Sequence, residues 1–367
     1  MPRITDLTAL TVRLPLPQPV ATSNLVITER DFVLVDVVVD GELRGTGFGF
    51  SRGGLVAETI EQNLKPLLIG GDPFLSEQLW QEMYQKTRYL GRKGLLMRAI
   101  SAVDIALWDA RAKLLNAPLW QLLGGFRRDL PVYVAGGYYR QDATIASLEH
   151  EFAGYREAGY RGAKLNLGGA PLAEDIQRVA AVRAVVGDDF ALAVDFNGSL
   201  RTAKRARAYL EGLEPYGLAF IEEPFLMDNL PALRELYRHA RVPIAVGEDE
   251  SGRWAFRELL APRALDLLRH DATLVGGVSE WLKVAHLGLA FNVELFPHWF
   301  PEIHLHLALS MPDCWGIEVI DPASGIMNFH QLLHNPVTAE DGMAKAPDEP
   351  GLGLSWNREV IRRHTVT

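Results

Sequence analysis

Residues 191–249 read ALAVDFNGSLRTAKRARAYLEGLEPYGLAFIEEPFLMDNLPALRELYRHARVPIAVGED, and this stretch decides the fold. Short apolar segments occupy residues 191–196, 219–222 and 243–247, and longer amphipathic segments lie between them. A short apolar run is typical of a buried strand, whereas a longer segment with one apolar face is typical of a helix. The stretch therefore predicts strands and helices in alternation.

The same alternation continues on both sides of this stretch. Apolar segments that fit strands recur at residues 131–135, 162–167, 265–270, 292–296 and 316–320. The linkers between consecutive strands are long enough to hold crossover helices. Eight strands that alternate with helices predict a closed (β/α)8 barrel.

The first part of the chain has a different order, with strands followed by helices. Residues 4–14 and 31–39 are rich in Val, Thr and Leu and predict strands. Helical patterns follow from residue 56 to 123, most clearly in 94–115, where apolar residues repeat at helical spacing. This order predicts an α+β domain.

We expect two loops in this part: a polar one over residues 21–30 and a second one over 45–54, which contains five glycines. The predicted division of the chain is an α+β domain over 1–125, the barrel over 126–328 and a C-terminal segment over 329–367. That last segment has a Pro-, Gly- and Asp-rich passage. We expect it to leave the barrel and return to the first domain.

Composition argues against several classes of protein. The net charge of −9 and the pI near 5.6 argue against a nucleic-acid partner, which favours a basic surface. No stretch approaches twenty apolar residues, and the N-terminus lacks the apolar core of a signal peptide. The single cysteine, Cys314, fits a reducing compartment. We therefore expect a cytoplasmic protein that binds neither membrane nor nucleic acid.

Ionisable residues stand at the ends of seven successive predicted strands, at intervals of 20 to 31 residues, about one strand–helix unit each. Active sites of barrels form at the C-terminal ends of the strands, so these side chains should converge. They are Lys164, Asp195, Glu222, Glu248, Asp271, His298 and Glu318.

Three of them, Asp195, Glu222 and Glu248, come from adjacent strands and predict a metal site. Ionised carboxylates so close together repel one another unless a cation lies among them. A set of oxygen ligands without Cys or His selects a hard ion, Mg²⁺ first, with Mn²⁺ or Ca²⁺ as alternatives. Asp249 follows Glu248 directly, so either could be the ligand there, while Glu223 should face away as a structural partner. The alternative is that some of these acids are helix caps or salt-bridge partners.

Asp271 and His298 end adjacent strands and predict a general base. An aspartate bonded to one imidazole nitrogen fixes the tautomer and leaves the other nitrogen free to take a proton. The alternative is an ordinary structural histidine. His304 and His306 lie on the next helix at a spacing that does not suit a shared metal site, so we assign them to packing or the surface.

Lys164 should bind a substrate carboxylate, with its pKa lowered by the neighbouring metal. Asn166 lies on the same face and can bind substrate, but it cannot act as a base at neutral pH. Glu318 could remain protonated in an apolar setting and donate to a developing enolate oxygen. Its alternative role is a strand-end salt bridge.

Further candidates for the wall of the site follow the same strands. Asn197 and Trp299 are predicted to contact substrate, as is Tyr138 at the end of the first barrel strand. Tyr139 and Phe300 could also shape the pocket. Packing in the core is an equally good explanation for the aromatic side chains.

These residues resemble the mandelate racemase branch of the enolase superfamily over essentially the full chain. Ser101-Ala-Val-Asp-Ile-Ala-Leu-Trp-Asp109 and Leu122-Leu-Gly-Gly125 are similar to the signature of that family's capping domain. In the barrel, the matching fragments are Val194-Asp-Phe-Asn197, Ile221-Glu-Glu-Pro224, Gly247-Glu248, Val275-Gly-Gly277 and His298.

The resemblance implies Mg²⁺ on the three carboxylates, a His298–Asp271 base and Glu318 near the enolate. It also implies that the N-terminal domain caps the barrel mouth, that its two loops choose the substrate, and that the protein is a homo-oligomer. The reaction it implies is removal of the proton beside a substrate carboxylate.

The sequence departs from the family at one motif. The usual Lys-x-Lys is Lys164-Leu-Asn166 here, so the second lysine, which serves as the base opposite the histidine, is missing. Chemistry with one base fits better, and dehydration of a sugar acid to a 2-keto-3-deoxy acid is the predicted reaction. The alternatives are a racemase or epimerase that uses Lys164, a lactone cycloisomerase, and a scaffold that binds metal and ligand without turnover.

Overall fold

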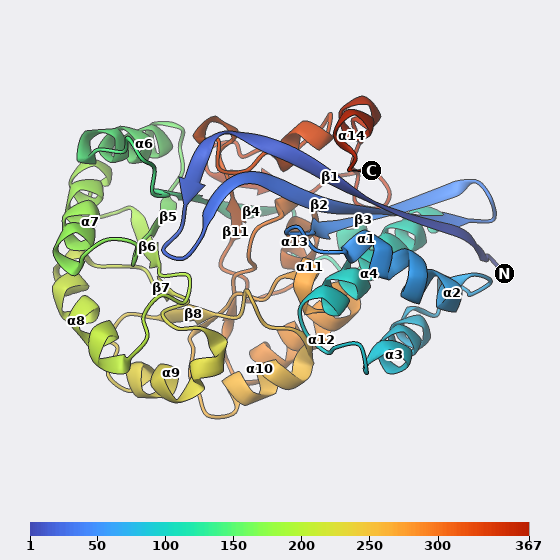
Figure 1. Ribbon diagram of the computed structural model, residues 1–367, viewed down its shortest axis with the longest axis horizontal. Coiled ribbons are helices and arrows are strands. Elements are labelled where there is room, and N and C mark those ends of the chain that lie inside the picture. The colour runs from blue at the N-terminus through green and yellow to red at the C-terminus, as the bar shows by residue number, and fades with distance from the viewer. Residues whose placement is uncertain (367) are drawn as a thin grey trace.

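A computed structural model describes residues 1–366, and its main body is the predicted barrel (Figure 1). The parallel strands follow one another around the sheet from β4 to β10, and β11 pairs with β4. A parallel bridge between Leu295 and Cys314 links the two ends of this path. The strands are β4 (Asp129–Gly136), β5 (Gly162–Asn166), β6 (Ala191–Asp195), β7 (Ile221–Glu222), β8 (Ile244–Val246), β9 (Leu267–Leu268), β10 (Glu294–Leu295) and β11 (Ile317–Val319). Each overlaps a predicted strand, so the predicted fold class is confirmed.

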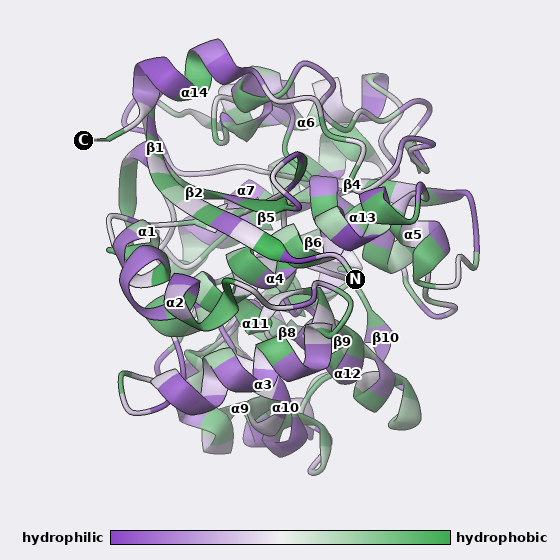
Figure 2. Cartoon of the chain, turned by 90° about the vertical axis from the view of Figure 1, so that its right-hand side faces the viewer, coloured by the Kyte–Doolittle hydropathy of each residue, from purple (hydrophilic) through white to green (hydrophobic). Residues whose placement is uncertain are grey.

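The helices of the barrel surround these strands, and Figure 2 shows bands of hydrophilic and hydrophobic residues along them, as expected for helices with one side against a core. They are α6 (Ile145–Glu157), α7 (Leu172–Val186), α8 (Ala203–Leu213), α9 (Leu230–Tyr237), α10 (Gly252–Leu260), α11 (Ala272–Val275), α12 (Gly277–Ala290) and α13 (Pro301–Leu309).

The N-terminal part forms an antiparallel sheet and a group of helices. The sheet has the order β1 (Ile4–Ala21), β2 (Val26–Val39) and β3 (Leu43–Phe50). The helices are α1 (Val56–Thr59), α2 (Lys65–Leu68), α3 (Ser76–Thr87), α4 (Leu95–Leu114) and α5 (Leu119–Leu122). α4 matches the predicted 94–115 helix and docks on the barrel, where Trp108 Nε1 donates to Ser279 Oγ at 2.8 Å.

Both expected loops are mostly strand, and these two predictions were wrong. β1 continues past Pro15 to Ala21, and β2 begins at Val26, so only residues 22–25 form a turn between them. Pro15 is tolerated because β1 is an edge strand, where a missing N–H breaks no inner ladder. In β3, Gly45 and Gly47 face the backbone of α4 so closely that a Cβ on Gly47 would lie 1.9 Å from the Ala102 carbonyl oxygen. These glycines therefore serve close packing of helix and strand.

The C-terminal segment makes contacts with both parts of the chain. β12 (Met343–Lys345) pairs antiparallel with the start of β4. Beyond α14 (Arg358–His364), the Val366 N–H donates to the Thr11 carbonyl of β1 at 2.8 Å. The boundaries at residues 125 and 328 stay predictions. No helix within residues 1–366 is both long and apolar enough to cross a membrane.

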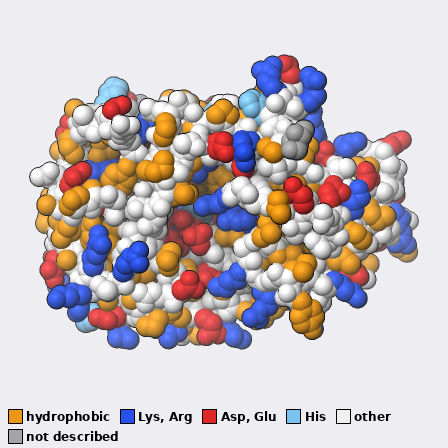
Figure 3. Space-filling model, in the orientation of Figure 1, with side chains coloured by type: hydrophobic (Ala, Val, Ile, Leu, Met, Phe, Trp, Pro, Cys, Tyr) orange, Lys and Arg blue, Asp and Glu red, His pale blue; other side chains and the backbone are white. Residues whose placement is uncertain are grey.

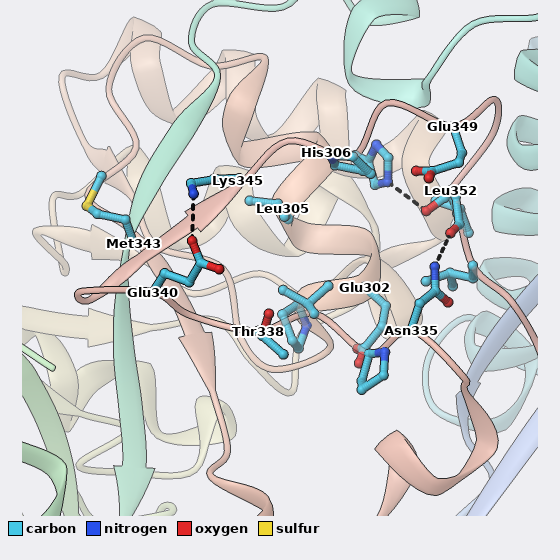
Figure 4. A pocket seen from close by; sticks show the side chains of 16 residues that line it. Glu302, Leu305, His306, Asn335, Thr338, Glu340, Met343, Lys345, Glu349 and Leu352 are labelled. Carbon is cyan, nitrogen blue, oxygen red and sulfur yellow. Dashed lines mark hydrogen bonds and ion pairs between the residues drawn. The ribbon is translucent and has the colours of Figure 1, made fainter. Parts of the chain in front are cut away.

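A cavity of about 200 Å³ lies between α13 and this C-terminal segment, and Figure 4 shows Glu302 and His306 among its lining residues. The His306 ring is buried. Its Nδ1 accepts from the Trp120 N–H at 3.2 Å, and its Nε2 lies 3.1 Å from the Leu352 carbonyl, to which it donates. His306 thus joins α5, α13 and the C-terminal segment, as the packing assignment predicted.

Burial lowers the pKa of His306 to about 4 from the ordinary 6.5. The unfolded chain therefore binds more protons between these values, and the stabilisation present above pH 6.5 is lost as the pH falls towards 4. We expect His306 to contribute on the order of 3 kcal/mol to this loss. The measurement is the free energy of unfolding at pH 7 and 4.5 in the native protein and in His306→Gln.

The prediction concerns the difference in pH dependence between the native protein and His306→Gln, because other groups titrate over the same pH range and affect both proteins. Burial raises the pKa of Glu302, one turn earlier on α13, to about 7. The stability contributed by Glu302 therefore increases as the pH falls, opposite to the contribution of His306. A His306→Gln variant with the same pH dependence as the native protein would contradict the prediction.

Candidate active site

The predicted site residues converge at the mouth of the barrel, under the turn that joins β1 and β2. Ser23 Oγ donates to the Phe196 carbonyl at 2.8 Å, and Asn24 Nδ2 donates to the Asn197 carbonyl at 2.7 Å. In Figure 1 this ribbon crosses in front of the barrel strands, and in Figure 3 acidic and basic atoms gather side by side in the hollow at the centre of the same face. The N-terminal domain therefore covers part of the mouth.

Three carboxylates at the ends of β6, β7 and just after β8 form a group that could hold a metal ion. One oxygen from each of Asp195, Glu222 and Glu248 lies within 4.8 Å of the others. Glu248, and not Asp249, is the member from the third strand. Burial and mutual repulsion raise the pKa of Asp195 to about 6 and that of Glu248 well above its usual range. The Oε2 atoms of Glu222 and Glu248 are buried and receive no well-oriented hydrogen bond from residues 1–366.

Two buried cations flank these carboxylates. Lys164 Nζ lies 2.6 Å from Glu222 Oε1, 2.9 Å from Glu318 Oε1 and 3.2 Å from Asp195 Oδ2. Arg269, which is fully buried, lies between Glu222 and Glu318, with Nη2 at 3.1 Å and 2.5 Å from their oxygens. Its Nη1 donates to the carbonyls of the segment after β10.

The charges of this cluster do not balance. Four carboxylates, those of the metal group and Glu318, face only the two positive charges of Lys164 and Arg269. When all are ionised, two negative charges remain, and a divalent cation would neutralise them. The geometry and the charge therefore both fit a hard divalent ion.

Arg269 is a member of the site that sequence reasoning missed. It directly follows β9 and lies two residues before Asp271, so strand alternation places it on the same face. That spacing was the available signal. The partners of its guanidinium, 47 and 49 residues away in sequence, were not visible without the fold.

Glu318 makes the salt bridges that were its alternative role, and the lowered pKa expected for Lys164 beside a bound metal stays a prediction. Burial alone would raise the pKa of Glu318, but Arg269 and Lys164 outweigh it and hold that pKa well below its usual range. These contacts favour an ionised Glu318 in salt bridges with Arg269 and Lys164. Burial would likewise lower the pKa of Lys164, but Glu222, Glu318 and Asp195 raise it well above its ordinary value.

Backbone turns just beyond the strands orient the metal group. Asn197 has a positive φ of 45°, and its N–H and Nδ2 donate to the two oxygens of Asp195 at 2.8 and 2.9 Å. Glu223 Oε1 accepts from the N–H groups of Gly247 and Glu248 at 2.6 and 3.2 Å. Glu223 is thus the structural partner that the sequence predicted, and Asn197 orients a metal-group carboxylate.

His298 and Asp271 lie together beside this group. His298 Nδ1 is 3.0 Å from Asp271 Oδ2, and its Nε2 is 3.4 Å from Glu248 Oε2. Asp271 is an anion, because the hydrogen bond from His298 and the nearby His304 outweigh burial and lower its pKa to about 2. It therefore accepts from Nδ1–H and leaves Nε2 as the nitrogen that faces the metal group.

His304 braces this pair from behind. Its Nε2 accepts from the Ala272 N–H at 2.9 Å, and its Nδ1 lies 2.5 Å from the Trp299 carbonyl. It thus joins the residue after Asp271 to the residue after His298. The sequence assigned His304 to packing, and its buried position agrees with that assignment.

Asn166 is fully buried next to Lys164, and neither its Oδ1 nor its Nδ2 has a hydrogen-bond partner within residues 1–366. A buried amide without partners is costly, so this side chain has unused capacity to bind a ligand or water. Its role in substrate binding stays a prediction.

The aromatic candidates divide into two groups. Tyr138 and Trp299 are buried at the mouth, and the Trp299 ring stacks on His298 with centroids 5.3 Å apart. Tyr139 instead donates to Asp175 of α7 at 2.7 Å. Phe300 packs among phenylalanines of the N-terminal sheet, 4.8 Å from the Phe50 ring. The packing explanation therefore fits Tyr139 and Phe300.

Replacing one metal-group carboxylate tests the proposed metal site. We expect Glu248→Gln to weaken Mg²⁺ binding by at least the roughly 10–100-fold that changes around metal ligands cost, because the group loses one negative charge. Calorimetric titration of the purified protein with MgCl₂ measures this. Asp249→Asn is the matched control, and equal affinity in Glu248→Gln and the native protein would contradict the site.

The fold and the site together define a barrel enzyme with three carboxylates and a His–Asp pair at its mouth, under an α+β cap. Models of two protein families cover most of the chain: the mandelate racemase / muconate lactonizing enzyme N-terminal domain matches residues 4–124, and the enolase C-terminal domain-like family matches residues 147–360. The chain belongs to the mandelate racemase / muconate lactonizing enzyme family of the enolase superfamily.

Relatives with known activity include dehydratases and cycloisomerases. Arabinonate dehydratase from Saccharolobus solfataricus is 35% identical over 87% of this chain and 86% of its own length. A 3,6-anhydro-alpha-L-galactonate cycloisomerase from Streptomyces coelicolor is 32% identical over 96% and 97%. The crystal structure of a racemase from Streptomyces coelicolor with bound magnesium is 31% identical, with a TM-score of 0.93 over 99% of this chain and 100% of that one.

Proposed function

We propose that this enzyme dehydrates a sugar acid to a 2-keto-3-deoxy acid, with Mg²⁺ as its cofactor. The observation that carries the proposal is the single oriented imidazole, His298, which faces the metal group while the strand end across the mouth carries Lys164 and Asn166. Elimination needs a base on only one face of the planar enolate that forms from the substrate. Racemisation needs a proton donor or acceptor on both faces of that enolate.

Asp195, Glu222 and Glu248 would hold the ion, which when bound polarises the substrate carboxylate and stabilises negative charge on it. Lys164 adds a fixed positive charge next to these ligands. His298 Nε2 takes the proton from the carbon beside the carboxylate, and Asp271 stabilises the imidazolium that forms.

The β-hydroxyl then leaves, and His298 supplies the proton that turns it into water. The carbon skeleton is left as an enol, which tautomerises to the 2-keto acid. The proton taken from the carbon beside the carboxylate and the departing β-hydroxyl together make one molecule of water. The step therefore balances without an oxidant or a reductant.

The test is a screen of the purified protein with Mg²⁺ against mono- and dicarboxylic sugar acids, with detection of 2-keto acid as its semicarbazone. We expect keto acid from at least one sugar acid and none with His298→Asn. A screen without keto acid, combined with exchange of the α-proton in D₂O by NMR, would overturn dehydration.

A second candidate is cycloisomerisation of a sugar-acid lactone. It is supported by the 32% identity to a cycloisomerase over nearly the whole chain, and it also needs only one base. The same NMR experiment with lactone substrates separates it from dehydration, because cycloisomerisation gives a product of unchanged mass.

A further inference from the structure

Three arginines of the N-terminal domain lie at the barrel mouth and have no part in the proposed proton transfer. Arg30 lies in β2, Arg52 follows β3 and Arg98 lies in the first turn of α4. Other arginines of the same sheet are paired with acids: Arg13 lies 2.7 Å from Asp31, and Arg44 lies 3.7 Å from Asp36. Within residues 1–366, no carboxylate lies at ion-pair distance from Arg30, Arg52 or Arg98.

Arg30 is buried one aromatic ring away from the proposed base. Its side chain donates through Nε and Nη2 to the Ile326 carbonyl, at 3.2 and 3.0 Å. The guanidinium lies 5.0 Å from the centre of the Trp299 ring, which in turn stacks on His298. Tyr138, another residue of the mouth, is the neighbouring side chain that offsets part of the cost of burying this charge.

Arg52 and Arg98 continue the positive charge across the mouth. Arg52 lies 5.2 Å from the centre of the Phe50 ring, the same ring that Arg30 approaches at 5.7 Å. Burial, followed by repulsion from Arg52, lowers the pKa of Arg98 to about 10, while the charges of Asp271 and Asp249 act against this shift. Arg98 lies one turn before Ser101 on α4, and Ser101 Oγ accepts from the N–H groups of Gly276 and Gly277 at 2.9 and 3.1 Å, so this side of α4 faces the barrel segment that follows Asp271.

Arg30 is buried, Arg98 is half-buried and Arg52 is exposed. Like charges that lie close together cost free energy unless an anion joins them, most of all where they are buried. A guanidinium matches a carboxylate well, because its planar fork can donate two parallel hydrogen bonds. Figure 3 shows basic atoms directly beside acidic ones in the hollow of this face, so positive and negative regions share one opening. One end of a substrate would bind at the metal group and the other among the arginines.

We propose that Arg30, Arg52 and Arg98 form a subsite for a second carboxylate, so that the substrate is a dicarboxylic sugar acid. This inference rests on the proposed function, because the first carboxylate is the one bound at the metal group. It selects diacids, with a carboxylate at both ends, over sugar acids that end in a hydroxymethyl group.

The experiment compares matched pairs, an aldarate and the aldonate of the same configuration, such as galactarate and galactonate. The native enzyme should prefer the diacid of a pair, and Arg52→Gln and Arg98→Gln should each lower the ratio of kcat/KM for diacid over monoacid by about 10–100-fold. Arg44→Gln, an exposed arginine of the same sheet, should leave the ratio unchanged. Arg52 and Arg98 are chosen because they are less buried than Arg30, whose loss would disturb folding.

Binding gives a readout that does not depend on turnover. In Mg²⁺-loaded His298→Asn protein, calorimetry should show the aldarate bound more tightly than its aldonate, and adding Arg52→Gln should remove this difference. If diacids bind in this way but the native enzyme yields no keto acid, the proposed dehydration fails and the subsite stands. Equal binding of both partners in every pair, or tighter binding of a phosphorylated aldonate, would overturn the subsite.

Discussion

Replacement of His298 by Asn should reduce turnover by roughly 10³-fold or more, since loss of a general base alone costs 10²–10⁴-fold. His298 presents an imidazole nitrogen to the metal group, 3.4 Å from Glu248 Oε2, while Asp271 holds its other nitrogen. Asn retains a hydrogen bond to Asp271 but cannot accept a proton. Keto-acid formation under saturating Mg²⁺ measures the effect.

Two further measurements show whether the loss is chemical. Mg²⁺ affinity and the unfolding midpoint of His298→Asn should stay near the native values, because the substitution removes no metal-group carboxylate. Asp271→Asn should lose less activity than His298→Asn, since it disturbs the orientation of the base without removing it. Turnover by His298→Asn at a tenth of the native rate or more would exclude His298 as the base.

Arg269→Met should destabilise the folded protein by about 3–5 kcal/mol, the cost of breaking a buried ion pair from one side. Arg269 and the two carboxylates it contacts, Glu222 and Glu318, are completely buried. Methionine fills a similar space but leaves both acids without their guanidinium. Urea unfolding at neutral pH with constant Mg²⁺ measures the change.

Arg269→Lys is the informative companion variant. It keeps the charge but cannot reach both carboxylates and the two carbonyls after β10 at once, so its stability should lie between those of Arg269→Met and the native protein. If Arg269→Met unfolded at the same urea midpoint as the native protein, the prediction would be wrong, and the charges of Glu222 and Glu318 would not depend on Arg269 for their neutralisation. Arg358→Met, which removes an exposed pair with Asp36, is the control for loss of a surface cation.

Much of the fold was predictable because its signals are local. A buried strand and the helix after it each leave a periodic pattern in the sequence, so all eight barrel strands and α4 were found close to their observed bounds. The errors lie where distant residues decide. Gly45 and Gly47 suggested a loop, but they allow α4, more than fifty residues away, to pack on a strand. The polar 21–30 segment suggested another loop, but its ladder with β1 makes most of it strand.

The candidate site divides in the same way. Regular spacing along the chain was enough to place Asp195, Glu222, Glu248 and the His298–Asp271 pair at one end of one barrel, because consecutive strands bring consecutive strand ends together. Spacing carries no information on which charges touch. The ion pairs of Glu318 and Lys164 and the role of Arg269 all follow from contacts across the barrel.

The sequence by itself thus determined the architecture, the family and the residue types available for chemistry, since these depend on local periodicity and order along the chain. The tertiary structure alone decided which charged side chains touch, as in the ion pairs that Lys164 and Arg269 make with the buried carboxylates. The physical reason is that electrostatic interaction depends on distance and burial in space, and neither can be read from separation along the chain.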